Sequence, residues 1–412
     1  MTTKLLHVAF FNRAYYPETS ATAELLTDLA EELTKNHGFK VSVVCGVSTR
    51  TGWRLITHEN HNEVSLFRAR GTRFPKQFFP GRLCNYLSYF SSACLAGLQL
   101  DKPDLVVALT DPPIIGLAAL VTKKRFGCRL VMAYKDLFPE VARLMENFHS
   151  PLLGKCLGQV NAVLIRNADQ ILALGNDMRD KLINEKQAPA EKTAVIPDYV
   201  DTDQITPSAK PNLFSETHGL SDKFVVMHSG NLGLSQNLEA VVEMASLLRD
   251  LPDLRVVFVG QGVKKESLQN LVRAKNLSNI LFLPYQPREQ LIHSFATADC
   301  FVVSLKAGVA GYITPSKLYG ILAAGRPYIA AIDDYSDAVR IAKEFQCGLP
   351  AIPGNAPDMA DKVRQLHANR TLCKTMGENA RRASFRYDRK AVAKEYADLF
   401  RSLSSSQSPC AA

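Results

Sequence analysis

The sequence of 412 residues lacks the cysteine spacing of a zinc site or a disulfide framework. Its nine cysteines include no C-x-x-C pair, and several lie in apolar stretches such as VSVVCG and ADCFVVSL. Structural zinc sites place cysteine and histidine ligands at short, regular spacings. We therefore interpret the cysteines as buried, reduced thiols in a reducing compartment, and we predict no metal ion and no other cofactor.

Long apolar runs are also absent. No window approaches the ~20 apolar residues that span a bilayer, and the best candidate, DLVVALTDPPIIGLAALV, is broken by Asp111, Pro112 and Pro113. The opening MTTKLLHVAFFNRAYYPE has neither the apolar stretch nor the cleavage site of a secretion signal. These absences predict a cytoplasmic protein, and they leave peripheral association with the inner face of the cell membrane open.

Carboxylates are missing from one long segment, because no aspartate or glutamate occurs between Asp299 and Asp333. The whole chain is basic, with a net charge of +9. This balance suits nucleic acid, an anionic membrane surface or a phosphorylated ligand, or it reflects only a mildly basic surface. Nucleic acid is a poor candidate, since no recognition motif accompanies the charge.

The chain contains a regular alternation of short apolar strands and amphipathic helices, which predicts parallel sheets covered on both faces. The first half begins with the strand KLLHVAFFN and a helix at 20–37. The proline-rich VIPDYVDTDQITPSAKP is a linker, and the second half repeats the pattern. We predict an α/β fold of two doubly wound, Rossmann-like domains facing across a cleft. The predicted parts are domains at 1–205 and 206–386, a helix at 387–403 that crosses back to the first domain, and a disordered tail at 404–412.

Three strand-end loops of the second domain offer hydrogen-bond donors to a phosphate. Gly230 and Gly233 follow a strand that ends at Ser229, and Gly260 and Gly262 follow the next strand. Glycines let backbone N–H groups approach a phosphate closely, and the helices that follow favour negative charge at their N-termini. Each glycine pair alone is equally consistent with a plain strand-to-helix turn.

The third loop leads into TPSKLYGILAAGRPYIA, which predicts a helix at 315–324. Thr314 suits the cap, Pro315 suits the first turn, and Lys317 adds a full positive charge. A diphosphate suits such a pocket, whereas a carboxylate does not. The alternative is that Lys317 is an ordinary exposed helix lysine.

The sequence resembles bacterial GT-B glycosyltransferases of the large retaining family four, in the group that builds capsule, colanic-acid and O-antigen polysaccharides. The resemblance runs nearly the whole length of the chain and is most specific in the last two of its matching segments. These segments are YYPETSATAELLTDLAEEL, YKDLFPE, VIPDYVDTDQITP, HSGNLGLSQNLEAVVEMA and TPSKLYGILAAGRPYIA.

The resemblance implies a metal-independent transfer of a sugar from a nucleotide-diphosphate donor to a lipid-linked or polysaccharide acceptor. The implied donor-binding residues are Ser229, Gly230, Asn231, Gly233, Gly262, Pro284, Tyr285, Thr314, Ser316 and Lys317. The implied acceptor-side residues are Glu18, Thr19 and Ser20. Lys317 would stabilise the leaving diphosphate, and Asp136 and Glu140 are candidate catalytic partners of the acceptor hydroxyl. Asp136 is equally suited to cap a turn before Pro139, and in this family the departing phosphate itself is a candidate proton acceptor.

One departure from the family pattern concerns the carboxylate that holds the donor ribose. The family carries two glutamates here, and this chain has Tyr312 and Gly320 in their places. Loss of a charged hydrogen bond, worth about 1.5–3 kcal/mol, predicts donor binding that is roughly ten- to a hundredfold weaker. A polar loop elsewhere could replace the carboxylate, donor affinity could be weak, or the enzyme could be inactive. Because the loss weakens binding and does not abolish the chemistry, we favour an active enzyme. One alternative function is a sugar-nucleotide epimerase or hydrolase of the same fold, and the other, which Gly320 suggests, is a non-catalytic sugar-nucleotide-binding assembly partner.

Residues 68–100 mix cations with aromatic side chains, which suits an anionic membrane surface. The cations are Arg68, Arg70, Arg73, Lys76 and Arg82, and the aromatic residues are Phe74, Phe78, Phe79, Tyr86, Tyr89 and Phe90. The alternative is that the aromatic residues belong to the core and the cations form a solvated rim. Asp201–Asp203 imitates a metal-binding D-x-D motif, but its place in the linker argues against that role.

Overall fold

The computed structural model describes residues 5–47, 54–75, 79–141 and 150–405, and the chain divides into two compact units. Unit 1 comprises residues 1–139, 150–197 and 389–412, and unit 2 comprises residues 140–149 and 198–388. The sequence analysis places the boundaries at 205/206 and 386/387, so the division in the linker falls earlier along the chain. Most of the predicted tail lies outside the described residues.

Unit 1 is built on an eight-stranded sheet with the order β3-β4-β2-β1-β5-β6-β7-β8. Every neighbouring pair is parallel except β3 and β4. The strands are β1 His7–Phe11, β2 Lys40–Gly46, β3 Ile56–His61, β4 Val64–Ala69, β5 Leu105–Ala108, β6 Arg129–Ala133, β7 Gln170–Ala173 and β8 Thr193–Val195.

Strand β3 is absent from the sequence analysis, which predicts parallel strands alone. It forms an antiparallel hairpin with β4, in which His61 pairs with Val64. The two turn residues, Asn62 and Glu63, both have positive φ angles, of 48° and 67°. Such a two-residue turn matches the twist of the flanking strands. The sequence signal is weak because β3 is a largely exposed, polar edge strand without an apolar alternation.

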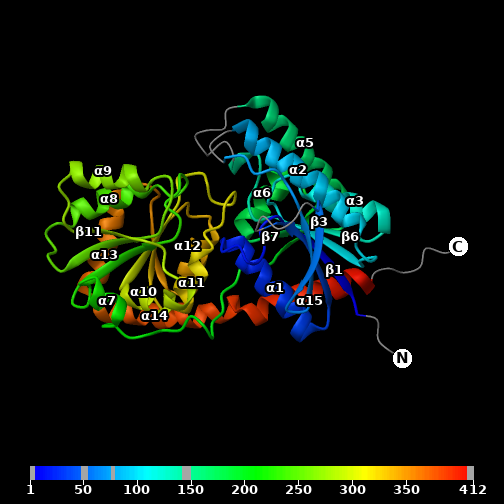
Figure 1. Ribbon diagram of the computed structural model, residues 1–412. Helices are drawn as coiled ribbons and strands as arrows, with labels where there is room; N and C mark the ends of the chain where they lie inside the picture. Colours follow the sequence, from blue (N-terminus) through cyan, green and yellow to red (C-terminus); the bar gives the residue numbers. More distant parts are fainter. Residues whose placement is uncertain (1–4, 48–53, 76–78, 142–149, 406–412) are drawn as a thin grey trace. The chain divides into compact units, whose positions relative to one another are not determined.

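Helices cover both faces of the unit 1 sheet. Figure 1 shows α2, α3 and α5 on one side of that sheet and α1 and α15 on the other. Helix α1 ends where Gly38 adopts a left-handed conformation (φ 72°), and α3 ends in the same way at Gly127. The helices are α1 Ala21–His37, α2 Phe79–Leu98, α3 Gly116–Phe126, α5 Pro151–Asn167, α6 Asn176–Lys186 and α15 Arg389–Ser405.

Unit 2 contains a six-stranded sheet with the order β11-β10-β9-β12-β13-β14, all of whose pairs are parallel. The strands are β9 Phe224–Ser229, β10 Leu254–Val259, β11 Ile280–Leu283, β12 Cys300–Ser304, β13 Tyr328–Ala331 and β14 Gly348–Ala351. The helices are α7 Leu213–Thr217, α8 Leu238–Leu247, α9 Lys265–Ala274, α10 Leu291–Thr297, α11 Lys317–Ala323, α12 Asp337–Glu344, α13 Ala356–Ala368 and α14 Arg370–Ser384.

The packing of strand β9 explains why its sequence is continuously apolar. Phe224 and Val226 pack into the core beside α8 and α13, whereas Val225 and Met227 pack into the core on the opposite face. Both faces of the strand are therefore buried, as in other parallel sheets covered by helices. The strand order reverses between β1 and β5 in unit 1 and between β9 and β12 in unit 2. Ligands of doubly wound sheets bind at the carboxyl ends of such strand pairs.

Candidate functional site

The loops that follow β9 and β10 lie against each other at the reversal point of unit 2. The N–H of Gly230 donates to the carbonyl of Val259 (2.8 Å), and that of Leu232 donates to Gln261 (2.8 Å). A Cβ atom at position 260 would lie 1.9 Å from the carbonyl oxygen of Gly230, and Gly260 has a φ of +149°. Glycine is required at this position by both the space and the backbone conformation.

Several backbone amides of these loops already have hydrogen-bond partners within the protein, so they are not available to donate to a ligand. Besides those of Gly230 and Leu232, the N–H of Gly233 is occupied, because it donates to the side-chain oxygen of Gln236 (2.8 Å). That partner is a side chain, so rotation of Gln236 would release the Gly233 amide. Asn231 is exposed at the tip of the loop, and Ser229 is buried at the end of β9.

Lys317 contacts a histidine that the sequence analysis does not identify. Its Nζ lies 3.0 Å from Nε2 of His228, which belongs to β9 and is 1% exposed. Burial lowers the pKa of Lys317 to about 7, and burial together with the Lys317 charge lowers the pKa of His228 well below its usual value. Lys317 also lies against Gly230, since a Cβ there would be 3.4 Å from Nζ. The signal in the sequence is a histidine directly before the glycine loop.

The helix that carries Lys317 begins later than predicted. Lys317 is the first residue of α11, and its cap is Ser316, whose side chain makes no capping hydrogen bond. The prediction that Thr314 caps the helix is therefore wrong. The Thr314 hydroxyl is instead buried, with no hydrogen-bond partner among the described residues. Proline restricts the residue before it, which keeps Thr314 out of the helix.

Gly320 faces the interior of unit 2. A Cβ at this position would lie 2.9 Å from Cε2 of Phe295 and 4.0 Å from Cδ1 of Ile205. Phe295 belongs to α10, is 6% exposed and packs edge-on against Phe301. The aromatic ring therefore fills the space into which a longer side chain at position 320 would extend.

Pro284 and Tyr285 follow the end of β11, and both are exposed. Tyr285 is 52% exposed. The strand end is tied to the glycine loops, because the N–H of Gly260 donates to the carbonyl of Leu283 (2.9 Å). Hydrogen bonds thus connect the loops that follow β9, β10 and β11.

The predicted carboxylates of the YKDLFPE segment are separated by the division into units. Asp136 follows β6 in unit 1, where its N–H donates to the hydroxyl of Thr110 (3.4 Å), and it lines a cavity of about 10 Å³. Glu140 belongs to unit 2 by its contacts.

Asp201 belongs to the segment that imitates a D-x-D motif. Its Oδ1 atom accepts hydrogen bonds from the N–H groups of Asp203 and Gln204 (both 3.0 Å). This carboxylate therefore closes a turn.

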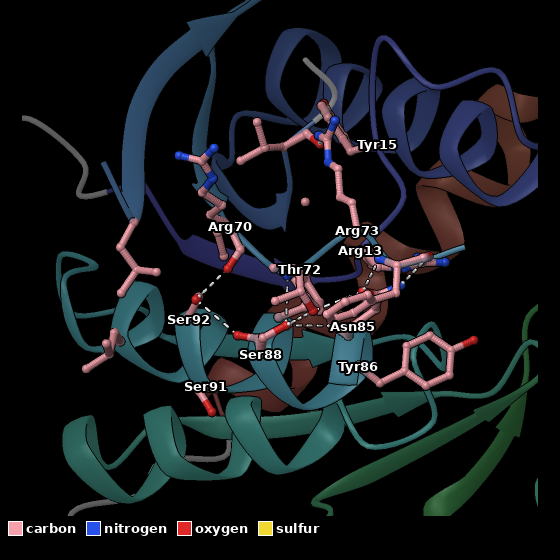
Figure 2. A pocket seen from close by; sticks show the side chains of 18 of the residues that line it. Arg13, Tyr15, Arg70, Thr72, Arg73, Asn85, Tyr86, Ser88, Ser91 and Ser92 are labelled. Atoms are coloured by element: carbon pink, nitrogen blue, oxygen red, sulfur yellow. Dashed lines mark hydrogen bonds between the residues drawn. The ribbon is translucent and has the colours of Figure 1, made fainter. Parts of the chain in front are cut away.

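A cavity of about 1150 Å³ lies in unit 1. Figure 2 shows its side chains, which come from the ends of β1, β2 and β4 and from α2. Of the predicted acceptor-side residues, Glu18 lines this cavity, whereas Thr19 and Ser20 are exposed beside α1. The sequence analysis does not identify Arg13, Asn85 or the serines of α2 as lining residues.

Two residues of the predicted membrane-facing segment are buried. Arg68 is 4% exposed and pairs with Glu59 of the neighbouring strand β3 (2.8 Å), and Tyr89 is 2% exposed. Their assignment to a membrane surface is therefore wrong. Lys76 and Phe78 lie outside the described residues.

Among the residues that are described, no helix is long and apolar enough to cross a membrane. In the same part of the chain, no three histidine, cysteine or acidic side chains cluster as metal ligands would.

Two family models match the chain in succession. Residues 23–204 match the model described as Glycosyltransferase Family 4, and residues 211–383 match the model described as Glycosyl transferases group 1. WcaI of Escherichia coli (strain K12), whose name assigns it to colanic acid biosynthesis as a glycosyl transferase, is 26% identical over 353 residues. That match covers 80% of this chain and 84% of WcaI.

Solved structures share the fold at low sequence identity. Sucrose-phosphate synthase from Thermosynechococcus elongatus superposes with a TM-score of 0.75 at 16% identity, over 98% of this chain and 100% of that one. HepE of Anabaena, in complex with UDP-glucose, superposes with a TM-score of 0.73 at 15% identity, over 96% of this chain and 100% of that one. These likenesses show the same two-domain fold.

Proposed function

The chain belongs to the glycosyltransferases of family 4 and group 1 and has the GT-B fold, and from this premise we propose which groups bind its substrates. The donor is a nucleotide-diphosphate sugar, bound by unit 2. The product belongs to surface polysaccharide biosynthesis, as the name of the relative WcaI suggests. The acceptor is lipid-linked or is the growing polysaccharide itself.

The observation that carries this proposal is the position of Lys317. It lies beside the Gly230 loop and His228, at the carboxyl end of β9, where the order of the unit 2 sheet reverses. A cation beside glycine loops at such a point is suited to a diphosphate. In the transition state the diphosphate leaves with additional negative charge, which Lys317 would stabilise.

We propose further that transfer retains the anomeric configuration and needs no metal ion. The charge that a divalent cation supplies to a leaving diphosphate in other enzymes is supplied by Lys317 in this proposal. Turnover measured with EDTA present should then equal turnover with added Mg²⁺ or Mn²⁺. If EDTA abolishes turnover and added Mg²⁺ restores it, the transfer requires a metal ion and this part of the proposal is wrong.

Asp136 and Glu140 are the proposed partners of the acceptor hydroxyl, with the departing phosphate as the alternative proton acceptor. Replacement of a general base lowers turnover by about 10²–10⁴-fold. We expect Asp136→Asn to show such a loss without weaker donor binding. Wild-type turnover in Asp136→Asn would leave Glu140 or the departing phosphate as the proton acceptor.

The proposed membrane contact lies on the segment 68–90. Phe74, Leu83 and Leu87 are exposed there, at 48%, 37% and 49%, and Arg73 provides a cation beside them. Apolar side chains with a neighbouring cation suit an anionic bilayer surface. Flotation with anionic liposomes should recover the wild-type protein and less of a Leu83→Ser/Leu87→Ser variant, and salt-insensitive or absent binding would contradict this contact.

The test of the function is a calorimetric titration with UDP-, GDP- and dTDP-sugars on wild type and Lys317→Ala, followed by donor turnover with and without acceptor. Binding of one donor that Lys317→Ala weakens about ten- to a hundredfold supports the proposal. Donor consumption without acceptor would instead indicate a hydrolase or epimerase. Donor binding without any turnover would indicate a non-catalytic binding partner.

A further inference from the structure

Lys317 is partly enclosed by unit 2, yet its polar neighbour is a histidine rather than a carboxylate. Its Nζ atom lies 3.0 Å from Nε2 of His228. Lysines that leave the protein surface usually pair with an acidic side chain. Among the described residues no carboxylate forms an ion pair with Lys317, and burial alone accounts for its lowered pKa. The protein therefore leaves the charge of this lysine uncompensated.

The segment without carboxylates in the sequence surrounds Lys317, and the two acidic residues that flank the segment have partners elsewhere. No aspartate or glutamate occurs between Asp299 and Asp333. Asp299 pairs with Lys210 (2.9 Å). The Oδ2 atom of Asp333 accepts from the N–H of Gly308 (2.9 Å). The segment thus brings no acidic group to the surroundings of Lys317.

The other groups around the His228 ring are uncharged. The ring of Phe258 in β10 lies at a centroid distance of 6.0 Å, and the carbonyl oxygen of Asn231 lies 3.5 Å from Nε2. His228 is 1% exposed, so water does not stabilise an imidazolium there. Burial and the charge of Lys317 both lower the pKa of His228. The ring is therefore neutral.

The distances indicate which nitrogen of the neutral ring carries the proton. An ammonium group has three N–H donors and no acceptor, so Nε2 must accept when Lys317 is charged. The competing contact of Nε2 with the Asn231 carbonyl, at 3.5 Å, is at the limit of a hydrogen bond. The buried Nδ1 has no hydrogen-bond partner among the described residues, so it favours neither tautomer. The ring proton then lies on Nδ1.

A neutral acceptor and a carboxylate have different consequences for an anion that approaches Lys317. A carboxylate at this distance would hold the ammonium strongly, but it would also cancel the lysine charge and repel a diphosphate. A neutral imidazole directs one N–H of the ammonium and leaves the charge in place. The directed ammonium stays beside the glycine loop, since a Cβ at Gly230 would lie 3.4 Å from Nζ.

We propose that His228 is a positioning residue for Lys317: as a neutral acceptor it fixes the ammonium beside the Gly230 loop and leaves the whole charge to an anionic ligand. The identity of that ligand as the donor diphosphate rests on the proposed function. The state of the His228–Lys317 pair does not, and the two parts are tested separately.

The first test examines the imidazole in the wild-type protein and needs no ligand. Long-range ¹H–¹⁵N NMR spectra of protein labelled with ¹⁵N-histidine distinguish the two neutral tautomers and the imidazolium. The His228→Gln variant identifies the signals of His228. We expect a neutral ring with its proton on Nδ1 from pH about 6.5 down to about 5.5, where an ordinary histidine becomes charged. A proton on Nε2, or an imidazolium in this interval, would overturn the proposal.

The second test compares two replacements that share a shape and differ in charge. Calorimetric titrations at pH about 6.5 measure the affinity of His228→Gln and His228→Glu for UDP, GDP, dTDP and inorganic pyrophosphate. The glutamine oxygen is a neutral acceptor, so that variant should stay within about threefold of wild type. The glutamate variant should bind about ten- to a hundredfold more weakly, like Lys317→Ala, because its carboxylate pairs with the lysine. Equal affinities in the two variants would overturn the proposal.

A third replacement separates positioning from charge. His228→Leu removes the acceptor without adding a charge, and we expect an affinity about three- to tenfold below wild type. His367→Gln is the control, because that histidine of α13 pairs with Asp253 (2.9 Å), at the amino end of β10. It should bind like wild type, and thermal melting checks that each variant is folded. Wild-type affinity in His228→Leu would overturn the positioning role.

A failure of the proposed function is recognised by a different result. If none of the four probes binds to wild type, the proposed donor site is wrong. The NMR measurement then decides the proposal for His228 by itself, since the tautomer of the ring does not depend on a ligand.

Discussion

Lys317 and His228 form a hydrogen-bonded pair in which the fold disfavours the charged form of both side chains. With a separation of 3.0 Å, a protonated Lys317 donates to a neutral His228. Burial lowers the pKa of Lys317 to about 7, so half of the lysine is neutral near that pH in the absence of donor. If the donor binds here as proposed, its diphosphate would favour the protonated lysine, and donor binding would be accompanied by uptake of a proton.

Donor affinity should therefore fall with rising pH. The protonated fraction of a group with a pKa of about 7 drops from about three quarters at pH ~6.5 to a few per cent at pH ~8.5. We expect the Kd for a UDP-sugar to rise about tenfold or more over this interval, measured by calorimetry. Lys317→Ala should bind weakly without this dependence, and an equal pH slope in that variant would assign the titration to another group.

Gly320 and Phe295 should be coupled in stability. A methyl group at position 320 would overlap the ring of Phe295, 2.9 Å away, and overpacking of this kind costs about 1–3 kcal/mol. We expect Gly320→Ala to lower the melting temperature and the added change Phe295→Leu to recover part of the loss. Gly158→Ala is the matched helical control, because nothing lies within 4 Å of its Cβ position. Equal melting temperatures for both glycine variants would contradict the packing argument.

At the scale of elements, the proposed donor site depends on two loops that hydrogen bonds join. The hydrogen bonds from Gly230 to Val259 and from Leu232 to Gln261 connect the loops at the ends of β9 and β10. The approach of the two backbones excludes a side chain at position 260. The geometry of the proposed site thus depends on both loops together, and a change in one loop would displace the other.

Gly260→Ala should damage this pair more than backbone strain alone explains. Its Cβ would collide with the Gly230 carbonyl at 1.9 Å, in addition to the cost of a φ of +149°. Gly219→Ala shares a positive φ (+65°) but has open space around its Cβ position, so about 1–3 kcal/mol is expected there. Chemical denaturation should show a larger loss of unfolding free energy for Gly260→Ala, together with loss of donor binding. Equal losses of unfolding free energy in the two variants would mean that backbone strain alone explains the effect of Gly260→Ala.

At the scale of the whole molecule, the last helix completes the unit formed by the first residues of the chain. Helix α15 packs against α1, and Phe400 contacts Phe10 and Phe39 edge-on at centroid distances of 6.2 and 6.1 Å. Phe400 is 0% exposed. Unit 1 therefore closes only after the whole of unit 2 has been synthesised.

Phe400→Ala should destabilise unit 1 selectively, by about 3–5 kcal/mol, because it leaves a cavity in that core. Hydrogen exchange should show lost protection in β1 and α1 and unchanged protection in β9 and β10. Phe385→Ala is the control, since that ring is 52% exposed. A uniform loss of protection in both units would mean that they unfold as one cooperative body.

The sequence by itself determined the class of fold and most of the strands. Apolar runs such as VSVVCG are local patterns. They predict a buried strand whatever position the strand takes in the sheet. The glycines at 230 and 260 also follow predicted strands in the sequence, so the positions of these two loops are predictable, whereas their role in donor binding stays a prediction. The hairpin of β3 is not, because an exposed polar edge strand has no apolar alternation to detect.

The tertiary structure decided which distant residues meet. Lys317 lies beside His228 and Gly320 beside Phe295, and no local pattern encodes either contact. The start of α11 also shifts past Pro315, because a helix of a few residues is positioned by its packing rather than by propensity. Arg68 and Arg70 show the same limit. They lie two residues apart in the sequence, but Arg68 is buried and pairs with the exposed Glu59, whereas Arg70 lines a cavity. Burial of a cation depends on a partner that folding brings from another strand, and a linear sequence does not specify that partner.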